Sequence, residues 1–420
     1  MGRRMFAMLV LFAACDRPAD APPESPPAAN PPAANPVAKP EAKPAVDTTA
    51  AAPAPTNAPL PPLIDEPLVP PPTTRDRPTF LDYCNGPATA AERAVVELLS
   101  DHVDHGSCAA RFAALQELRK VDLSMKKITT AAPLVGLDSL VELDIAFNEI
   151  RDIGPIGTLH NLRKLNIHSL RAPSLEPLRG LTRLVELTAT ARAVKNIDAI
   201  AELPRLEILH LQYVKVTDLS PLAKLPELRV LWLGHNKALH DLSPLAGLAT
   251  LEELYVDGPN GVRTLDAIAP LVGLKKLSVF GGVGVKDPTA VAAFASLKEL
   301  SLRLVAGAKL PPLASLAKLD YVHLEHGGIV DVAALENASS ITQLYLDDNR
   351  ISSIEPLRTL TALEFARLSN NPIRDLSPLA GLEQLTGLQL GSMAVVKDEA
   401  HCPTSGESTL ATWCRGYLAR

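Results

Sequence analysis

Cysteine has the clearest chemical arrangement of any residue type in this 420-residue chain. Cys15 follows a short apolar run near the N-terminus, and the other four cysteines form two close pairs, Cys84 with Cys108 and Cys402 with Cys414. Each pair suits a structural disulfide, which implies an oxidising compartment. Four cysteines allow three pairings, and the local one is expected if the pairs lie at opposite ends of an elongated molecule. The neighbouring histidines do not have a zinc-binding spacing, so no metal site is predicted.

The first fifteen residues predict export. Residues 1–14 contain two arginines and an apolar run that is too short to span a bilayer, which is typical of a signal peptide. The ending F-A-A-C resembles the lipobox of bacterial lipoproteins: Ala13, Ala14 and Cys15 match, whereas Phe12 replaces the usual leucine. This resemblance implies that Cys15 is lipid-modified and attaches the protein to a membrane. The alternative is an ordinary secretory signal that is cleaved nearby.

Recognisable catalytic motifs are absent from the sequence. It contains no G-x-S-x-G, H-E-x-x-H, Walker or C-x-x-C motif. The acidic stretch 347–349 lacks the glycine and the terminal glutamate of an EF-hand loop. The glycines at 281–284 do not open a helix and therefore read as a loop rather than a phosphate site. We expect neither enzymatic activity nor a cofactor.

A repeat of 22 or 23 residues fills most of the chain. The stretch 225–248 reads L-x-x-L-x-x-L-x-L-x-x-N followed by D-L-S-P-L-A-G-L, which predicts a short strand and a tight return. One such unit exposes its leucine face, so copies must stack. The first residues of the copies, taken here as the starts of repeats 1 to 13, are Leu115, Leu137, Leu159, Leu181, Leu203, Leu225, Leu248, Leu271, Phe294, Leu316, Ala338, Leu360 and Leu382.

These units resemble the 22-residue leucine-rich repeat of internalins, most clearly at 140–159 and 363–382. The resemblance covers residues 115–391. It implies an α/β solenoid, a horseshoe or rod with a parallel β-sheet on its concave face and short 3-10 or irregular returns on its convex face. It also implies that the concave face binds a partner, and that the asparagine ending each strand forms a structural ladder. Other residues interrupt that ladder at Lys126, Leu170, Arg192, Val214, Pro259 and Gly282, so we expect less regular middle repeats, with 280–288 the loosest stretch.

Three segments flank the repeats. Residues 15–78 are rich in proline and alanine, which predicts a disordered tether that holds the repeats away from the membrane. Residues 79–114 predict a helical N-terminal cap in which Ser107 begins a short helix. Residues 392–420 predict a C-terminal cap with an amphipathic helix over 408–417.

Aromatic residues gather at the strand positions that point outward. Because a core built from leucine does not require them, they are candidates for ligand contact. We expect two patches, one centred on Trp232 and Tyr255 and the other on Tyr345 and Phe365. The candidate ligand-binding residues are His210, Tyr213, Trp232, Tyr255 and Phe280 in repeats 5 to 8, and Tyr321, His323, Tyr345, Phe365 and Arg367 in repeats 10 to 12. The alternative is that the rings only support neighbouring strands.

The sequence therefore predicts a non-catalytic lipoprotein of the bacterial cell envelope that binds a protein or a carbohydrate on its concave face. The net charge of −6 and the interspersed charges do not suit a nucleic-acid partner. The alternatives are a structural scaffold or spacer without a specific ligand, and an accessory or inhibitor subunit of an envelope enzyme. We expect a monomer, located at the outer membrane, at the cell surface or in the periplasm.

Overall fold

The computed structural model describes residues 67–70, 76–104, 106–190, 192–391, 401–402 and 408–418. The chain divides into two units, Met1–Ala54 and Pro55–Arg420, and every described residue belongs to the second. The expected signal peptide, Cys15 and most of the expected tether lie outside the described residues. No helix in the described ranges is long and apolar enough to cross a membrane.

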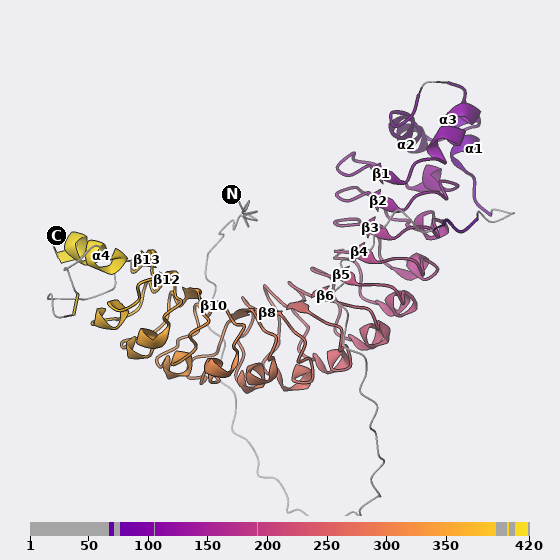
Figure 1. Ribbon diagram of the computed structural model, residues 1–420. Helices are drawn as coiled ribbons and strands as arrows, with labels where there is room; N and C mark the ends of the chain where they lie inside the picture. The colour runs from indigo at the N-terminus through magenta and orange to yellow at the C-terminus, as the bar shows by residue number, and fades with distance from the viewer. Residues whose placement is uncertain are drawn as a thin grey trace, which may run out of the picture. The chain divides into compact units, whose positions relative to one another are not determined.

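Thirteen short parallel strands form a single sheet in chain order, one strand from each repeat (Figure 1). Adjacent strands pair in register, so that Leu231 lies opposite Leu254. The predicted parallel sheet is therefore confirmed. The strands are β1 Lys120–Asp122, β2 Glu142–Asp144, β3 Lys164–Asn166, β4 Glu186–Thr188, β5 Ile208–His210, β6 Val230–Trp232, β7 Glu253–Tyr255, β8 Lys276–Val279, β9 Glu299–Leu302, β10 Tyr321–His323, β11 Gln343–Tyr345, β12 Phe365–Arg367 and β13 Gly387–Gln389.

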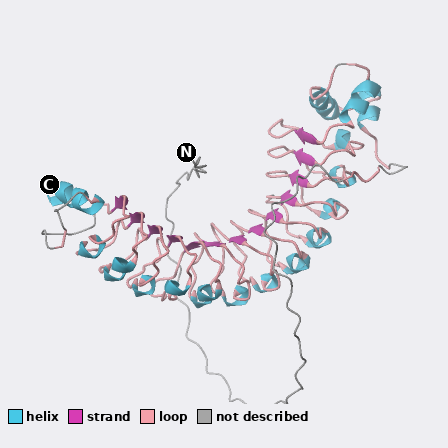
Figure 2. Ribbon diagram, in the orientation of Figure 1, coloured by secondary structure: helices cyan, strands magenta, loops and turns pink. Residues whose placement is uncertain are grey.

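A 3-10 helix returns the chain on the face opposite the sheet, as Figure 2 shows for the repeats. Proline occupies one of the first two positions of several of these helices, where its fixed φ suits the turn and its missing N–H costs no hydrogen bond. The helices are η1 Ala132–Leu134, η2 Ile156–Thr158, η3 Glu176–Leu178, η4 Asp198–Glu202, η5 Ser220–Lys224, η6 Ser243–Leu245, η7 Asp266–Ile268, η8 Thr289–Ala293, η9 Leu313–Ser315, η10 Ala333–Leu335, η11 Glu355–Thr359 and η12 Ser377–Leu379.

Leucine fills the space between the sheet and the 3-10 helices. In repeat 6, Leu228, Leu231 and Leu233 are fully buried, and the equivalent residues of the other repeats extend the same core along the stack. Phe294 takes the leucine position at the start of repeat 9 and is also fully buried. Because the core is continuous, each repeat is stabilised by its two neighbours.

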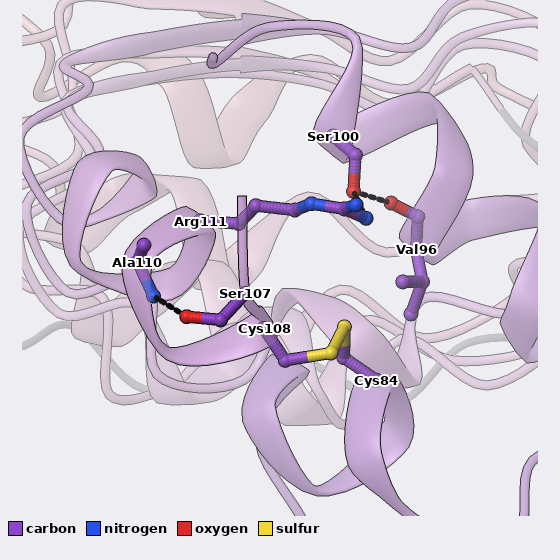
Figure 3. The surroundings of a disulfide bond; sticks show 7 residues. All are labelled: Cys84, Val96, Ser100, Ser107, Cys108, Ala110 and Arg111. Atoms are coloured by element: carbon purple, nitrogen blue, oxygen red, sulfur yellow. Dashed lines mark hydrogen bonds between the residues drawn. A yellow bond between two sulfur atoms is a disulfide. The ribbon is translucent and has the colours of Figure 1, made fainter. Parts of the chain in front are cut away.

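Three α-helices cover the N-terminal end: α1 Phe80–Asn85, α2 Ala90–Ser100 and α3 Cys108–Leu115. Ser107 caps α3, as predicted, and accepts a hydrogen bond from the amide of Ala110 at 3.3 Å. The structure joins Cys84 of α1 to Cys108 of α3, with 5.7 Å between their Cα atoms (Figure 3). Helix α1 was not expected from the sequence.

The C-terminal end is covered by α4 Thr409–Leu418. Cys414 of this helix is joined to Cys402, with 5.5 Å between the Cα atoms, and both cysteines are fully buried. The carbonyl of His401 accepts a hydrogen bond from the amide of Leu376 at 2.8 Å. This segment is thereby held against the last repeats.

Residues 67–70, within the expected tether over 15–78, lie against repeats 3 and 4. The amide of Val69 donates to Asn161 Oδ1 at 2.8 Å, and Asn161 Nδ2 donates to the Val69 carbonyl at 3.0 Å. Arg183 donates to the carbonyl of Pro67 at 2.9 Å. Asn161 is buried, and a buried amide needs such partners. This short part of the segment therefore contacts the repeats.

The asparagine ladder is confirmed as structural. Buried Asn349 donates to the carbonyls of Leu324 and Leu346 at 2.7 and 3.0 Å and accepts from the amides of Gly327 and Ile329 at 3.1 and 3.0 Å. The side chain thus satisfies backbone groups of its own repeat and of the preceding one. Asn148, Asn236 and Asn371 occupy the same position and donate to carbonyls in the same way.

At the expected interruption of the ladder at Pro259, the neighbouring Asn260 of this 23-residue repeat forms hydrogen bonds within its own repeat. It donates to the carbonyl of Val256 at 2.7 Å and accepts from the amide of Val262 at 3.0 Å, whereas Asn349 also bonds to the preceding repeat. The stretch 280–288 is more firmly attached than expected, because Val285 is fully buried and because Val285 and Asp287 form β-bridges to other repeats.

Candidate binding surface

The outward positions of β5, β6 and β7 bring three rings into one stack, the central cluster of His210, Trp232 and Tyr255. Parallel pairing in register places His210 opposite Trp232 and Trp232 opposite Tyr255. The ring centroids of Trp232 and Tyr255 lie 3.9 Å apart with an interplanar angle of 19°, and those of His210 and Trp232 lie 5.5 Å apart. The first expected patch is thus a continuous aromatic strip across three strands.

Hydrogen bonding and burial keep the side chains of the central cluster uncharged. The Tyr255 hydroxyl donates a hydrogen bond to Glu253 Oε2 at 2.9 Å. Burial raises the pKa of Tyr255, so that its hydroxyl stays protonated and neutral. Burial also lowers the pKa of His210. At neutral pH the cluster therefore presents uncharged rings, which suits stacking.

The outward residues of β10, β11 and β12, together with Phe280 after β8, form a second group, the C-terminal cluster of Phe280, Tyr321, His323, Tyr345, Phe365 and Arg367. The centroid of Tyr345 lies 5.2 Å from that of Tyr321 and 5.5 Å from that of Phe365. The Arg367 guanidinium lies over the Tyr345 ring, 5.6 Å from its centroid. Burial raises the pKa of Tyr321 to about 12, so this hydroxyl also stays neutral.

Phe280 and Tyr213 lie away from the patch in which they were expected. Phe280 follows β8, yet its ring centroid is 4.5 Å from that of His323 in β10, so it belongs to the C-terminal cluster. Tyr213 lies in the loop after β5 and stacks on His235 with 4.2 Å between centroids. Moreover, the strand rings are half-buried against one another rather than fully exposed; in the repeats, Phe147 and Tyr213 are the exposed aromatic residues, at 54% and 40%.

Glu325 and Asp347, which the sequence reading missed, form the polar base of the C-terminal cluster. Arg367 Nε lies 2.8 Å from Asp347 Oδ2, and Arg367 Nη1 lies 3.8 Å from Glu325 Oε1. Glu325 Oε2 is 3.1 Å from His323 Nε2. Burial raises the pKa of Asp347, although the Ser369 amide donates to its carboxylate at 2.7 Å. Each acid lies at the next outward position of its strand, Glu325 two residues after His323 and Asp347 two residues after Tyr345. A comparison of this position across the repeats would have identified both residues.

A row of left-handed residues follows the strands along one edge of the sheet. Glycine fills this position at Gly258 and Gly281, but bulky residues hold the same conformation elsewhere, such as Phe147 at φ 56° and Tyr213 at φ 58°. A left-handed side chain costs about 1–2 kcal/mol. Strained residues of this kind are a signal of function.

The surface is chemically suited to binding. Aromatic faces stack on apolar or ring-shaped groups, and Arg367 supplies a planar cation. The His323–Glu325 pair has the composition of a proton-transfer pair, but the nearby guanidinium of Arg367 contacts the same carboxylate. His210 and His323 lie five repeats apart, too far for them to act as one dyad.

Comparisons with known proteins agree with this architecture. The family model for two copies of the leucine-rich repeat matches residues 204–247. An internalin (inlF) from Listeria monocytogenes is similar in structure with a TM-score of 0.67 and 25% identity, over 73% of this chain and 90% of that one. A leucine-rich repeat protein from Leptospira interrogans has a TM-score of 0.53 and 23% identity, over 68% and 87% of the two chains.

A plant structure is also similar: the ectodomain of the Arabidopsis thaliana receptor kinase GASSHO1/SCHENGEN3, solved in complex with CASPARIAN STRIP INTEGRITY FACTOR 2. Its TM-score is 0.52 and its identity 19%, over 66% of this chain and 35% of that one. A search of the curated proteins found no match. The stacked strands, the asparagine ladder and these similarities together identify the fold as a leucine-rich repeat solenoid.

Proposed function

We propose that this chain is an exported, lipid-anchored protein of the bacterial cell envelope that binds a protein partner on its concave face without catalysing a reaction. The observation that carries the proposal is the preassembled aromatic surface, in which Trp232 lies between His210 and Tyr255 and a second cluster surrounds Tyr345. Tryptophan, tyrosine and arginine are the residue types found most often at binding hot spots.

The stacked arrangement supports binding on energetic grounds. Ordering a free side chain at an interface costs about 0.5–1.5 kcal/mol. Trp232 and Tyr255 are already held by their mutual stack, and Tyr255 is further held through Glu253. A partner that covers these rings therefore gains apolar contact at little entropic cost.

A protein partner is favoured over a carbohydrate. The two clusters lie on strands separated by β8 and β9, where Ser278 and Ser301 take the central outward position. Two groups of aromatic side chains that are separated by small polar side chains suit a partner with a broad contact surface. The plant receptor ectodomain that was solved in complex with CASPARIAN STRIP INTEGRITY FACTOR 2 has the same repeat fold.

The envelope location rests on the N-terminal sequence and on cysteine use. The motif ending at Cys15 supports lipid attachment, and the two disulfides of the end caps suit an exported protein. The proline-rich segment after Cys15 would separate the repeats from the membrane.

The test is capture of partners by the folded protein from solubilised envelope. Two double variants, Trp232→Ala with Tyr255→Ala and Tyr345→Ala with Phe365→Ala, each remove one cluster. The matched control replaces small residues of the same outward column, Thr188→Ala with Ser301→Ala. We expect the wild type and the control to capture the same protein, and at least one cluster variant to lose it by about tenfold or more.

Equal capture by all four proteins would contradict a role for the aromatic clusters and would favour a scaffold or spacer. Capture of a polysaccharide that is lost in a cluster variant would replace the protein partner of the concave face by a carbohydrate. Capture of an envelope enzyme with a change in its activity would identify an accessory or inhibitor subunit.

A further inference from the structure

Two adjoining cavities form a groove along the loop edge of repeats 2 to 6, outside the aromatic clusters of the sheet. The first has a volume of about 650 Å³ and the second about 440 Å³. Arg192 and Tyr213 line both cavities, so these two residues lie where the cavities meet.

The groove is basic, although the chain as a whole carries a net charge of −6. Each of five consecutive repeats contributes one exposed cation to the lining: Arg151, Arg171, Arg192, Lys215 and Lys237. Among the described residues, no aspartate or glutamate lines either cavity. Within the part of the chain that the structure describes, Arg171 alone of these five is ion-paired, to Glu149 at 3.3 Å. The cations are therefore available to an anionic ligand.

The groove coincides with the interruption of the asparagine ladder. Leu170 and Val214 are buried at ladder positions and cannot form its hydrogen bonds, whereas Arg192 at the same position is exposed to solvent. Its guanidinium lies over the Tyr213 ring, 5.8 Å from the centroid. The Tyr213 ring in turn stacks on His235. Arg192 is thus supported by two rings rather than extending freely into solvent.

Neutral polar groups lie among the cations. His168 and Thr190 line the first cavity and are hydrogen-bonded to each other. Burial lowers the pKa of His168, which favours the neutral ring. A site for simple phosphate needs only donors, whereas a hydroxyl and a neutral imidazole both donate and accept. This combination matches a ligand that carries hydroxyl groups as well as negative charge.

We propose that this groove binds a linear acidic polysaccharide with one carboxylate on each sugar. Successive repeats are separated by the strand spacing of about 4.8 Å, which is close to the length of one sugar ring in an extended polyuronate. The row of cations therefore meets carboxylates along the chain, while His168 and Thr190 meet ring hydroxyls.

Other linear polyanions match the groove less well. An extended acidic peptide of aspartate or glutamate carries carboxylates but no hydroxyl groups that could meet His168 and Thr190. The phosphates of a duplex strand recur about every 3.4 Å along the helix axis. Neither polymer has the hydroxyl groups and negative charges of a polyuronate at this interval.

The experiment measures binding of fluorescent polygalacturonate oligomers to the full chain by anisotropy at low ionic strength, with a chelator present. The ligand control is the methyl-esterified oligomer, which has the same rings without the charges. The groove variant is Arg192→Glu with Lys215→Glu. The protein control is Arg350→Glu, because Arg350 follows the ladder residue Asn349 as Lys237 follows Asn236, but lies outside the groove.

We expect the wild type and Arg350→Glu to bind the charged oligomer equally and the esterified oligomer at least about tenfold more weakly. The groove variant should lose at least about tenfold in affinity, with an unchanged circular dichroism spectrum and melting temperature. The Trp232→Ala, Tyr255→Ala variant should keep wild-type affinity, which separates this site from the concave face.

Absence of binding by the wild type, or equal binding by the groove variant, would overturn the proposal. Tighter binding of poly-glutamate or single-stranded DNA of the same length would overturn the choice of ligand and assign the groove to that polymer instead.

Discussion

Replacing the two stacked rings of the central cluster distinguishes a binding surface from packing support. Trp232 and Tyr255 are half-buried on the outward face of β6 and β7, whereas Leu231, their neighbour on the inward face, is fully buried. If the rings serve a partner, the isolated protein should depend on them little. If they only support the strands, their loss should resemble the loss of a core residue.

The expected magnitudes follow from this geometry. A stacked pair such as this one, with centroids 3.9 Å apart, contributes about 0.5–1.5 kcal/mol beyond area burial. Including the partial burial, we expect Trp232→Ala to lower the free energy of unfolding by about 1–2 kcal/mol. Leu231→Ala, which opens a cavity in a close-packed core, should lower it by about 2–5 kcal/mol.

Chemical denaturation followed by circular dichroism measures these free energies. A double-mutant cycle of Trp232→Ala and Tyr255→Ala should give a coupling of about 0.5–1.5 kcal/mol. A loss for Trp232→Ala as large as that for Leu231→Ala would place the ring in the core and refute its assignment as a surface available to a partner.

Three further predictions concern the ladder, a buried acid and the left-handed row. Asn349→Leu should lower the free energy of unfolding, measured by heat or urea, by about 2–4 kcal/mol, because it leaves buried backbone groups unpaired. An unchanged free energy of unfolding would contradict the structural role of the asparagine ladder. Burial raises the pKa of Asp257 above its ordinary 3.8, so the folded state binds the proton more tightly than the unfolded state does. The free energy of unfolding should therefore fall as the pH rises from 3.8 through the pKa of the folded state. Unfolding measured across this range should depend less on pH in Asp257→Asn, and an unchanged slope would refute the assignment. Met125→Gly should raise stability by about 0.5 kcal/mol, because glycine adopts the left-handed conformation freely; a lower melting temperature would show that Met125 is not strained.

The fold could be predicted from the sequence because its determinants are local and repeated. Leu228, Leu231 and Leu233 specify the inward face of one strand, and a constant repeat length places the same face in register in the next. The proline of η6 and the serine that caps α3 are likewise read from adjacent residues. Repetition turns local signals into a complete architecture.

The candidate surface could be predicted only in part, because its contacts depend on distance across repeats. The Trp232–Tyr255 stack follows from adjacent in-register strands. By contrast, Phe280 meets His323 across two repeats, and Val69 meets Asn161 from a segment that has no periodic pattern. Such contacts depend on side-chain reach and on the course of loops, which no spacing in the sequence specifies.

The basic groove escaped the sequence reading for a related reason. Arg171 and Lys215 occupy the same repeat position, but Arg192 lies one position earlier, at a ladder site. A column-by-column reading therefore separates cations that the fold brings to one edge. Asn260 escaped in the same way, because it lies one residue beyond the ladder position and bonds to backbone groups of its own repeat.

Photo-cross-linking in the native envelope tests the central claim most directly. A photoreactive amino acid is placed at position 232 on the concave face of the full-length, exported chain, and a matched one at position 224, exposed on η5 at the opposite face. We predict a discrete cross-linked protein from position 232 that is absent from position 224. The same products from both positions, or none from position 232, would contradict binding through the concave aromatic face.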